Sequence, residues 1–291
     1  MSEADPIRHA LCRLGYLPFS KPTSSPPRRM IRAFQREHGL RADGIIGPRT
    51  KAALALALEE SVTSAAPEKI QAAVPPMSMD AAVSFLDIAR RISPGFFISP
   101  AENHVHLLAV RGWKDGEAVP NRLDEYNDTI HVVSWDGSPA RVYPFPASVD
   151  PGRLREPDPR GTAHLVAGNY RYRLGLHRGR ERALVQAGPV EVMRYSDITP
   201  DAVPIREEGW FGINMHRGGT GAAVGPWSAG CQVIHGSLWH AFLHLLLAAH
   251  CAGQRIYPYT LVEGDMLARE VAEAQLEAQS MSAGDVSIVS A

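Results

Sequence analysis

Apolar residues fall at helical spacing through much of the first 58 residues. In segment 7–14 they recur at i, i+4 and i+7, as on one face of a helix, and Ile31, Phe34 and His38 follow a similar spacing in segment 31–38. The Ser- and Pro-rich segment 20–27 predicts a loop between these helices. A turn signal at Asp43-Gly44 precedes a third, Ala- and Leu-rich helix. The pattern therefore predicts a small three-helix bundle.

The next segments differ in composition from that bundle. Residues 59–79 are rich in Ser, Ala and Pro with little periodicity, which predicts a linker. Residues 79–92 return to helical spacing and end at Ser93-Pro94-Gly95, so a connecting helix is expected within 80–97.

From residue 98 to 262 the pattern changes to short β-rich runs separated by Gly, Pro and Asn. Strands are predicted at 104–110, 129–135, 141–145, 183–186, 190–195, 211–216 and 256–262. One helix, 238–251, interrupts them, and the tail 263–291 begins helical and then frays. The expected class is α+β: a three-helix bundle over 1–58, then a mainly antiparallel β-sandwich or barrel with one or two packed helices.

Composition and charge narrow the class of function. The formal net charge is -1, which argues against nucleic acid as a partner. We expect no membrane span, because no run reaches about 18 uncharged apolar residues. The first residues lack a basic region followed by an apolar one, so we expect synthesis in the cytoplasm without a secretory signal. Three cysteines are too few and too scattered for a disulfide framework or a cysteine zinc site.

Five short elements of the first module agree with a known pattern. They are Phe34-Gln35, Gly39-Leu40, Asp43-Gly44, Gly47 and Thr50. Segment 5–58 thereby resembles the peptidoglycan-binding three-helix domain of bacterial cell-wall enzymes. The resemblance implies peptidoglycan as a partner. It also implies Phe34, Gln35, Asp43, Gly44 and Thr50 as wall-binding residues.

The strongest candidate chemistry lies in segment 212–234. If 211–216 is a strand, Asn214 and His216 share one face of it. A Gly-rich loop follows, and then Cys231 in Ser-Ala-Gly-Cys. A cysteine becomes nucleophilic when a neighbouring base takes its proton, and His216 could be that base. The backbone N–H groups of Gly230 and Cys231 could form an oxyanion pocket.

This arrangement resembles the L,D-transpeptidase catalytic domain, over roughly residues 100–262. His216, Ser228, Gly230 and Cys231 match the positions of that family's signature. The resemblance implies acyl transfer on peptidoglycan stem peptides through a Cys231 thioester, without a cofactor. It further implies that the backbone carbonyl of Arg217 orients His216.

Other residues of the segment are candidates for substrate contact, namely Asn214, Trp227, Ser228 and Gln232. Two residues depart from the family pattern: Ala229 stands where the family has His, and Gln232 stands where an Arg is common. The departures indicate a divergent branch, for which hydrolysis, as an L,D-carboxypeptidase or endopeptidase, is slightly favoured over crosslinking or exchange. Such an enzyme would act at the bacterial cell wall, in the periplasm or on a target cell's envelope, for example as an endolysin or a secreted effector.

Three alternatives remain open. A zinc peptidase or amidase could use His240 and His244, four apart on a helix, although no His-Glu-x-x-His motif is present and we expect no metal. A glycosidase would need two opposed carboxylates, with candidates at 207–208 and 124–125. The third alternative is a protein that only binds the cell wall and whose second domain has lost its activity. Ala229 and Gln232 favour this alternative.

Overall fold

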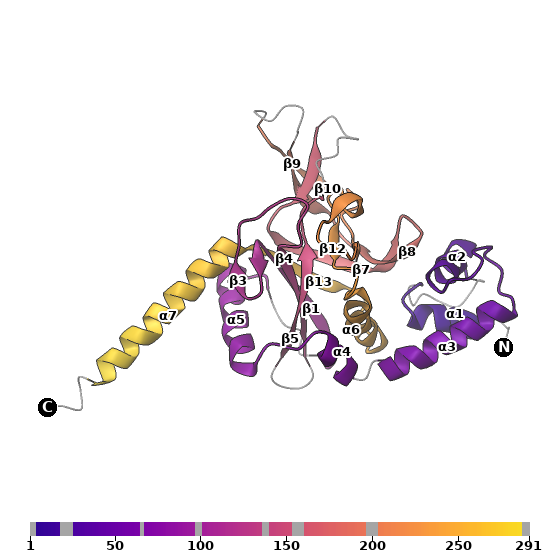
Figure 1. Ribbon diagram of the computed structural model, residues 1–291, viewed down its shortest axis with the longest axis horizontal. Helices are drawn as coiled ribbons and strands as arrows, with labels where there is room; N and C mark the ends of the chain where they lie inside the picture. Colours follow the sequence, from indigo (N-terminus) through magenta and orange to yellow (C-terminus); the bar gives the residue numbers. More distant parts are fainter. Residues whose placement is uncertain are drawn as a thin grey trace.

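The computed structural model describes residues 4–17, 26–64, 67–96, 101–135, 140–152, 160–195 and 203–286. In this part of the chain an N-terminal helical module and further helices surround a β-barrel (Figure 1). The α+β class predicted from the sequence is confirmed. The helices are α1 (Ala4–Arg13), α2 (Arg28–Glu37), α3 (Pro48–Ser64), α4 (Pro67–Ala73), α5 (Met79–Ile92), η1 (Gly225–Trp227), α6 (Trp239–Cys251) and α7 (Gly264–Val286).

The strands divide among one barrel and two small sheets. They are β1 (Val105–Arg111), β2 (Trp113–Lys114), β3 (Glu117–Ala118), β4 (Asp128–Ser134), β5 (Arg141–Ser148), β6 (Thr162–Leu165), β7 (Gly168–His177), β8 (Glu181–Gln186), β9 (Val190–Tyr195), β10 (Ile205–Gly209), β11 (Met215–Arg217), β12 (Gln232–Ile234) and β13 (Tyr257–Glu263).

Helices α1 to α3 form the module around a shared core. Leu11, Phe34 and Leu54 contribute one buried side chain from each helix. Tyr16 meets Phe34 edge to face, with ring centroids 5.5 Å apart. The three helices predicted from apolar spacing are present, and most of the predicted loop 20–27 lies outside the described residues.

The chain between module and barrel is more helical than its composition indicates. Helix α3 continues to Ser64, and α4 also falls within segment 59–79. Alanine is a strong helix former, and the Pro residues sit where helices begin or end. Helix α5 has the predicted bounds, and Ser78 caps it by accepting a hydrogen bond from the Ala81 N–H.

The barrel closes in the order β1-β13-β7-β8-β11-β12-β5-β4. The pairs β1–β13 and β11–β12 are parallel, and the other neighbours are antiparallel. Large side chains such as Phe145, Tyr172 and Tyr259 are fully buried in its core. Helix α6 joins that core through Phe242, which meets Phe145 edge to face at 5.3 Å.

A second core lies on the outer face of β1. Leu107 belongs to the barrel core, whereas its neighbour Leu108 belongs to a cluster with Phe85 of α5 and Leu267 of α7. Both faces of β1 are thus covered, which explains why its residues from Val105 to Val110 are all buried. Figure 1 shows α5 and α7 side by side on this flank.

The predicted strand 211–216 is wrong over most of its length. Only Met215–Arg217 pairs as β11, because Gly212 adopts a φ of +73°, in the left-handed region that interrupts an extended strand. Strands β6 and β10 flank β9 in a separate sheet, and β10 was not predicted. The outer strand β10 is polar, so its sequence carries no apolar alternation.

A buried ion pair joins the module to the barrel. Arg182 of β8, whose side chain is 8% exposed, lies 2.6 Å from a Glu37 carboxylate oxygen of α2. The same guanidinium donates to the Leu14 carbonyl and stacks over the Tyr16 ring at 4.7 Å. Arg36 of α2 donates to two carbonyls of the turn between β7 and β8. The module therefore contacts the hairpin that carries part of the site described next.

Candidate active site and cell-wall module

Cys231 lies in the turn that leads into β12. Because β12 runs parallel to β11, with Gln232 beside Met215, Cys231 sits near the start of β11. Its thiol donates to the Gly212 carbonyl, with Sγ and O 3.4 Å apart. Burial raises the pKa of the thiol. Cys231 is therefore a protonated thiol at neutral pH, and a base is needed to activate it.

His216 of β11 presents a free basic nitrogen. Its Nδ1 lies 2.8 Å from the Arg217 carbonyl oxygen, and since that oxygen only accepts, Nδ1 carries the proton. Nε2 is then the unprotonated nitrogen, and it is buried with no hydrogen-bond partner in the described part of the chain. Burial lowers the pKa of His216 to about 4, so the ring is a neutral base at neutral pH.

A second histidine, His177 at the end of β7, stacks on His216. The ring centroids are 4.1 Å apart and the planes 24° from parallel. Asn214 fixes the tautomer of His177: its Oδ1 accepts from the Gln186 N–H, so its Nδ2 faces the Nδ1 of His177 at 3.2 Å. Nδ1 of His177 therefore accepts, and Nε2 carries the proton. Burial, with His216 next, lowers the pKa of His177 to about 3.

His177, His216 and Cys231 form what we call the His–Cys cluster. Their ligand-type atoms lie within 4.8 Å of one another. One neutral histidine offers a lone pair, the other an N–H, and the cysteine a thiol, which suits proton transfer from sulfur. Sequence reasoning missed His177, because only the pairing of β7, β8 and β11 brings it to this place.

The same three side chains could hold zinc, since Cys and His are its preferred ligands. The tautomer that Asn214 imposes on His177 is not compatible with zinc binding. The Nε2–H of His177 has no lone pair for a metal, and its Nδ1 lone pair accepts from Asn214. Zinc would require the Asn214 amide or the His177 ring to turn.

Ser228 and Gly230 shape the turn around Cys231. The Ser228 hydroxyl is 2.6 Å from the Cys231 carbonyl oxygen and accepts from the Gly230 N–H at 3.2 Å. That N–H is thereby engaged within the turn, and Ser228 is buried. The oxyanion role of Gly230 and the substrate contact of Ser228 stay predictions.

Gly230 has no room for a side chain. Its φ is +119°, and a Cβ there would lie 2.5 Å from the Ala163 carbonyl oxygen. We expect Gly230→Ala to destabilise the protein by about 1–3 kcal/mol in urea unfolding, because the backbone must shift. Gly221→Ala in the preceding loop is the matched control, since nothing lies within 4 Å of its added Cβ. Equal effects of the two variants would contradict this account.

Gln232 and Trp227 are two further predicted substrate contacts. Gln232 follows Cys231 and points to the opposite face, where it is fully buried and its Oε1 accepts from the Tyr259 hydroxyl. It packs in the barrel core, and its predicted contact with substrate stays a prediction. Trp227 in η1 is 44% exposed and borders Gly219, outside the His–Cys cluster.

The pKa directions give a test of the resting state of the cluster. Because the pKa of Cys231 is raised and that of His216 is near 4, we expect a thiol–imidazole pair between pH 5 and 8. Alkylation of Cys231 by iodoacetamide should then rise about tenfold per pH unit, as the thiolate fraction does. Peptide mapping separates Cys231 from the exposed Cys251. A rate constant that is flat over this range would indicate a preformed thiolate–imidazolium pair.

In the module, the predicted wall-binding residues form an internal network. Gln35 is buried; it accepts from the Gly44 N–H and donates towards Asp43 and the Thr50 hydroxyl. Phe34 is fully buried, and Thr50 is 5% exposed. Gln35 thereby joins α2 to the turn before α3 and to Thr50, while Phe34 packs in the core of the module. Direct contact of these residues with the wall stays a prediction.

The residues proposed for other chemistries have structural partners. Glu207 binds Arg194 and Arg160 at 2.7 and 2.6 Å. Asp124 accepts from the Gly225 N–H at 2.5 Å. His240 and His244 lie on α6, and the cluster of metal-type donors in the described residues is the His–Cys cluster instead.

Comparison with known proteins bears on the module. No curated protein and no solved structure matches the chain. None of the helices in the described residues is long and apolar enough to cross a membrane. Residues 5–54, however, match the family model for a peptidoglycan binding domain. The match supports peptidoglycan as a partner and the cell wall as the place of action, and it covers the segment from α1 into α3.

Proposed function

We propose that the protein is a cysteine-dependent peptidoglycan enzyme, similar to L,D-transpeptidases, that acts on stem peptides. The observation that carries the proposal is the complementary pair of tautomers in the His–Cys cluster. His216 holds an unprotonated Nε2 and His177 an Nε2–H, and one ring nitrogen of each lies within 4.8 Å of the Cys231 Sγ. The peptidoglycan-binding module supplies the substrate class.

The reaction begins with transfer of the Cys231 proton to His216 Nε2. Sγ then attacks an amide carbonyl of the stem peptide, and the Nε2–H of His177 stabilises the negative charge that develops. The C–N bond breaks as His216 returns the proton to the leaving amine, which leaves a thioester. Water attacks the thioester, His216 takes its proton, and the C–S bond breaks to release the acid and restore the thiol.

Hydrolysis is favoured over crosslinking for one reason at the site. The residue after the nucleophile, Gln232, is buried against Tyr259, so this position offers no basic side chain to a second stem peptide. An amine acceptor in place of water would give transpeptidation by the same steps.

The direct test is mass spectrometry of purified muropeptides after incubation with wild type and with Cys231→Ala. Shortened stems or split dimers that depend on Cys231 would support hydrolysis, and the mass lost would identify the bond. New crosslinked or exchanged species would support transpeptidation. If neither protein changes the muropeptides, the proposed enzyme activity is contradicted, and a protein that only binds the cell wall remains as the alternative.

A zinc peptidase is the second candidate, and the Cys and two His donors of the cluster favour it. It predicts activity that a chelator removes and zinc restores. The cysteine mechanism predicts activity that survives chelation and is lost on alkylation of Cys231.

A further inference from the structure

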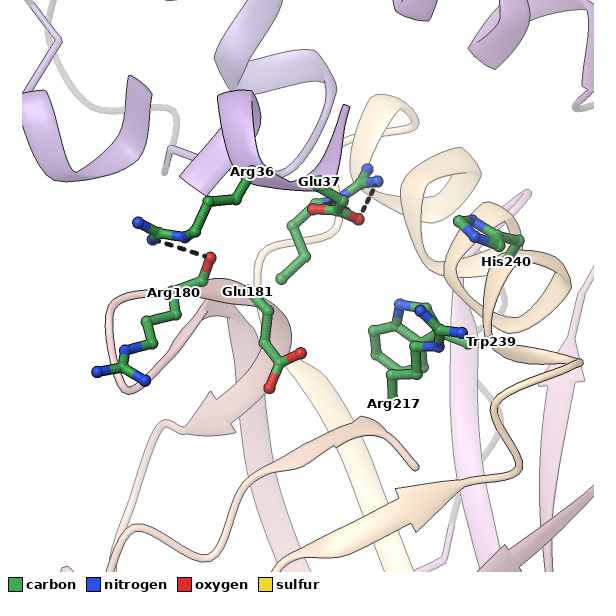
Figure 2. A pocket seen from close by; sticks show the side chains of 8 residues that line it. Arg36, Glu37, Arg180, Glu181, Arg217, Trp239 and His240 are labelled. Carbon is green, nitrogen blue, oxygen red and sulfur yellow. Dashed lines mark hydrogen bonds and ion pairs between the residues drawn. The ribbon is translucent and has the colours of Figure 1, made fainter. Parts of the chain in front are cut away.

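A cavity of about 400 Å³ lies between the module and the barrel, beside the His–Cys cluster. Arg36 and Glu37 of α2 form one wall, while Glu181, Arg217 and Trp239 lie on the barrel side (Figure 2). Its size is within the range of pockets that hold small ligands or parts of peptides.

The charges of this cavity favour an anion. Four arginines and two glutamates line it. Arg182 and Glu37 neutralise each other, and Arg36 donates to backbone carbonyls without losing its charge. Burial, with Glu37 next, raises the pKa of Glu181, and the arginines outnumber the glutamates even when both carboxyls are ionised. In the described part of the chain Arg217 has no carboxylate within ion-pair distance.

The cavity lies next to the base of the proposed reaction, because two of its lining residues adjoin His216. Arg217 follows His216, and its carbonyl holds the His216 Nδ1. Glu181 Oε1 lies 4.0 Å from the same nitrogen. Two residues that line the cavity, Glu181 and Arg217, are therefore within reach of the base, Arg217 through its backbone carbonyl.

We propose that this cavity binds a free carboxylate of the stem peptide, with Arg217 as the main contact and Arg36 of the module as the second. The inference rests on the proposed function and deepens it. A guanidinium binds a carboxylate through paired hydrogen bonds, which an uncharged carboxamide cannot match in strength. The N-terminal module then forms one side of the substrate site, in addition to its role in binding the cell wall.

The test measures binding, so that it does not depend on turnover. Calorimetry with Cys231→Ala protein compares a synthetic tetrapeptide stem that ends in a carboxylate with the same peptide as a carboxamide. We expect the carboxylate to bind about 10- to 100-fold more tightly, as a charge-assisted hydrogen bond provides. Adding Arg217→Ala should bring that ratio near one, and adding Arg36→Ala should lower it. Arg173→Ala, an exposed arginine of β7, should leave the ratio unchanged.

Two results would overturn the inference: equal affinity for both peptides, including no binding of either, or a ratio that survives Arg217→Ala. Failure of the proposed function looks different. The carboxylate preference would then persist in binding and depend on Arg217, while wild-type protein leaves both peptides intact.

Discussion

Cys231→Ala is expected to reduce product formation from stem peptides by roughly 10³-fold or more. Removal of a catalytic nucleophile leaves only the residual effect of binding and positioning. The variant should fold normally, because the Sγ of Cys231 makes one weak hydrogen bond, to the Gly212 carbonyl. The measurement is the initial rate of product release from purified muropeptides, followed by chromatography.

The matched control is Cys251→Ala, an exposed cysteine at the end of α6. It should keep the wild-type rate. A Cys231→Ala variant with a rate near that of wild type would contradict the thioester mechanism. A rate that instead falls on chelation would indicate that the same cluster holds zinc, as the second candidate function requires.

Glu37→Gln is expected to weaken the contact between module and barrel by about 3–5 kcal/mol, because it leaves the Arg182 charge buried without its partner. Burial opposes ionisation of Glu37, yet Arg182 outweighs it and the pKa of Glu37 is lowered. A lowered carboxyl pKa stabilises the folded state above the unfolded value, and this stabilisation is lost as pH falls through the folded value. The effect of acidification should therefore begin as pH falls below about 4.3, the ordinary pKa of Glu, and should match that of the substitution only below the lowered pKa of Glu37.

Hydrogen exchange of the α2 and β8 amides measures this contact, and both segments should exchange faster in Glu37→Gln. Glu117→Gln, an exposed glutamate of β3, is the control. The double variant Glu37→Leu with Arg182→Met should be less destabilised than Glu37→Leu alone, since an apolar pair can replace a buried ion pair. Unchanged exchange in Glu37→Gln would contradict a docked module.

The sequence predicted those elements whose signal is local. The apolar spacing of α5 gave its bounds, and the β-branched run of β9 gave that strand. Prediction from the sequence failed where contacts with distant segments determine the local structure. Strand β10 is polar because it lies at the edge of its sheet, and Gly212 ends the strand predicted before His216.

The candidate site was likewise predictable only in part. The spacing of His216 and Cys231 is local information, and the structure places both in one cluster. His177 comes from a distant strand, and no spacing points to it. Gln232 looked like a substrate contact because it adjoins Cys231, but strand alternation turns it into the core. The same alternation could have indicated this, had β12 been placed correctly.

The most direct test of the cysteine mechanism is to trap the acyl-enzyme. Wild-type protein is mixed with a stem peptide, quenched in acid within seconds, and analysed by intact mass and peptide mapping. The account predicts an adduct equal to the donor peptide minus its leaving amine, carried by Cys231 and released by hydroxylamine as expected of a thioester. Turnover without any adduct on Cys231, or an adduct on another residue, would contradict it.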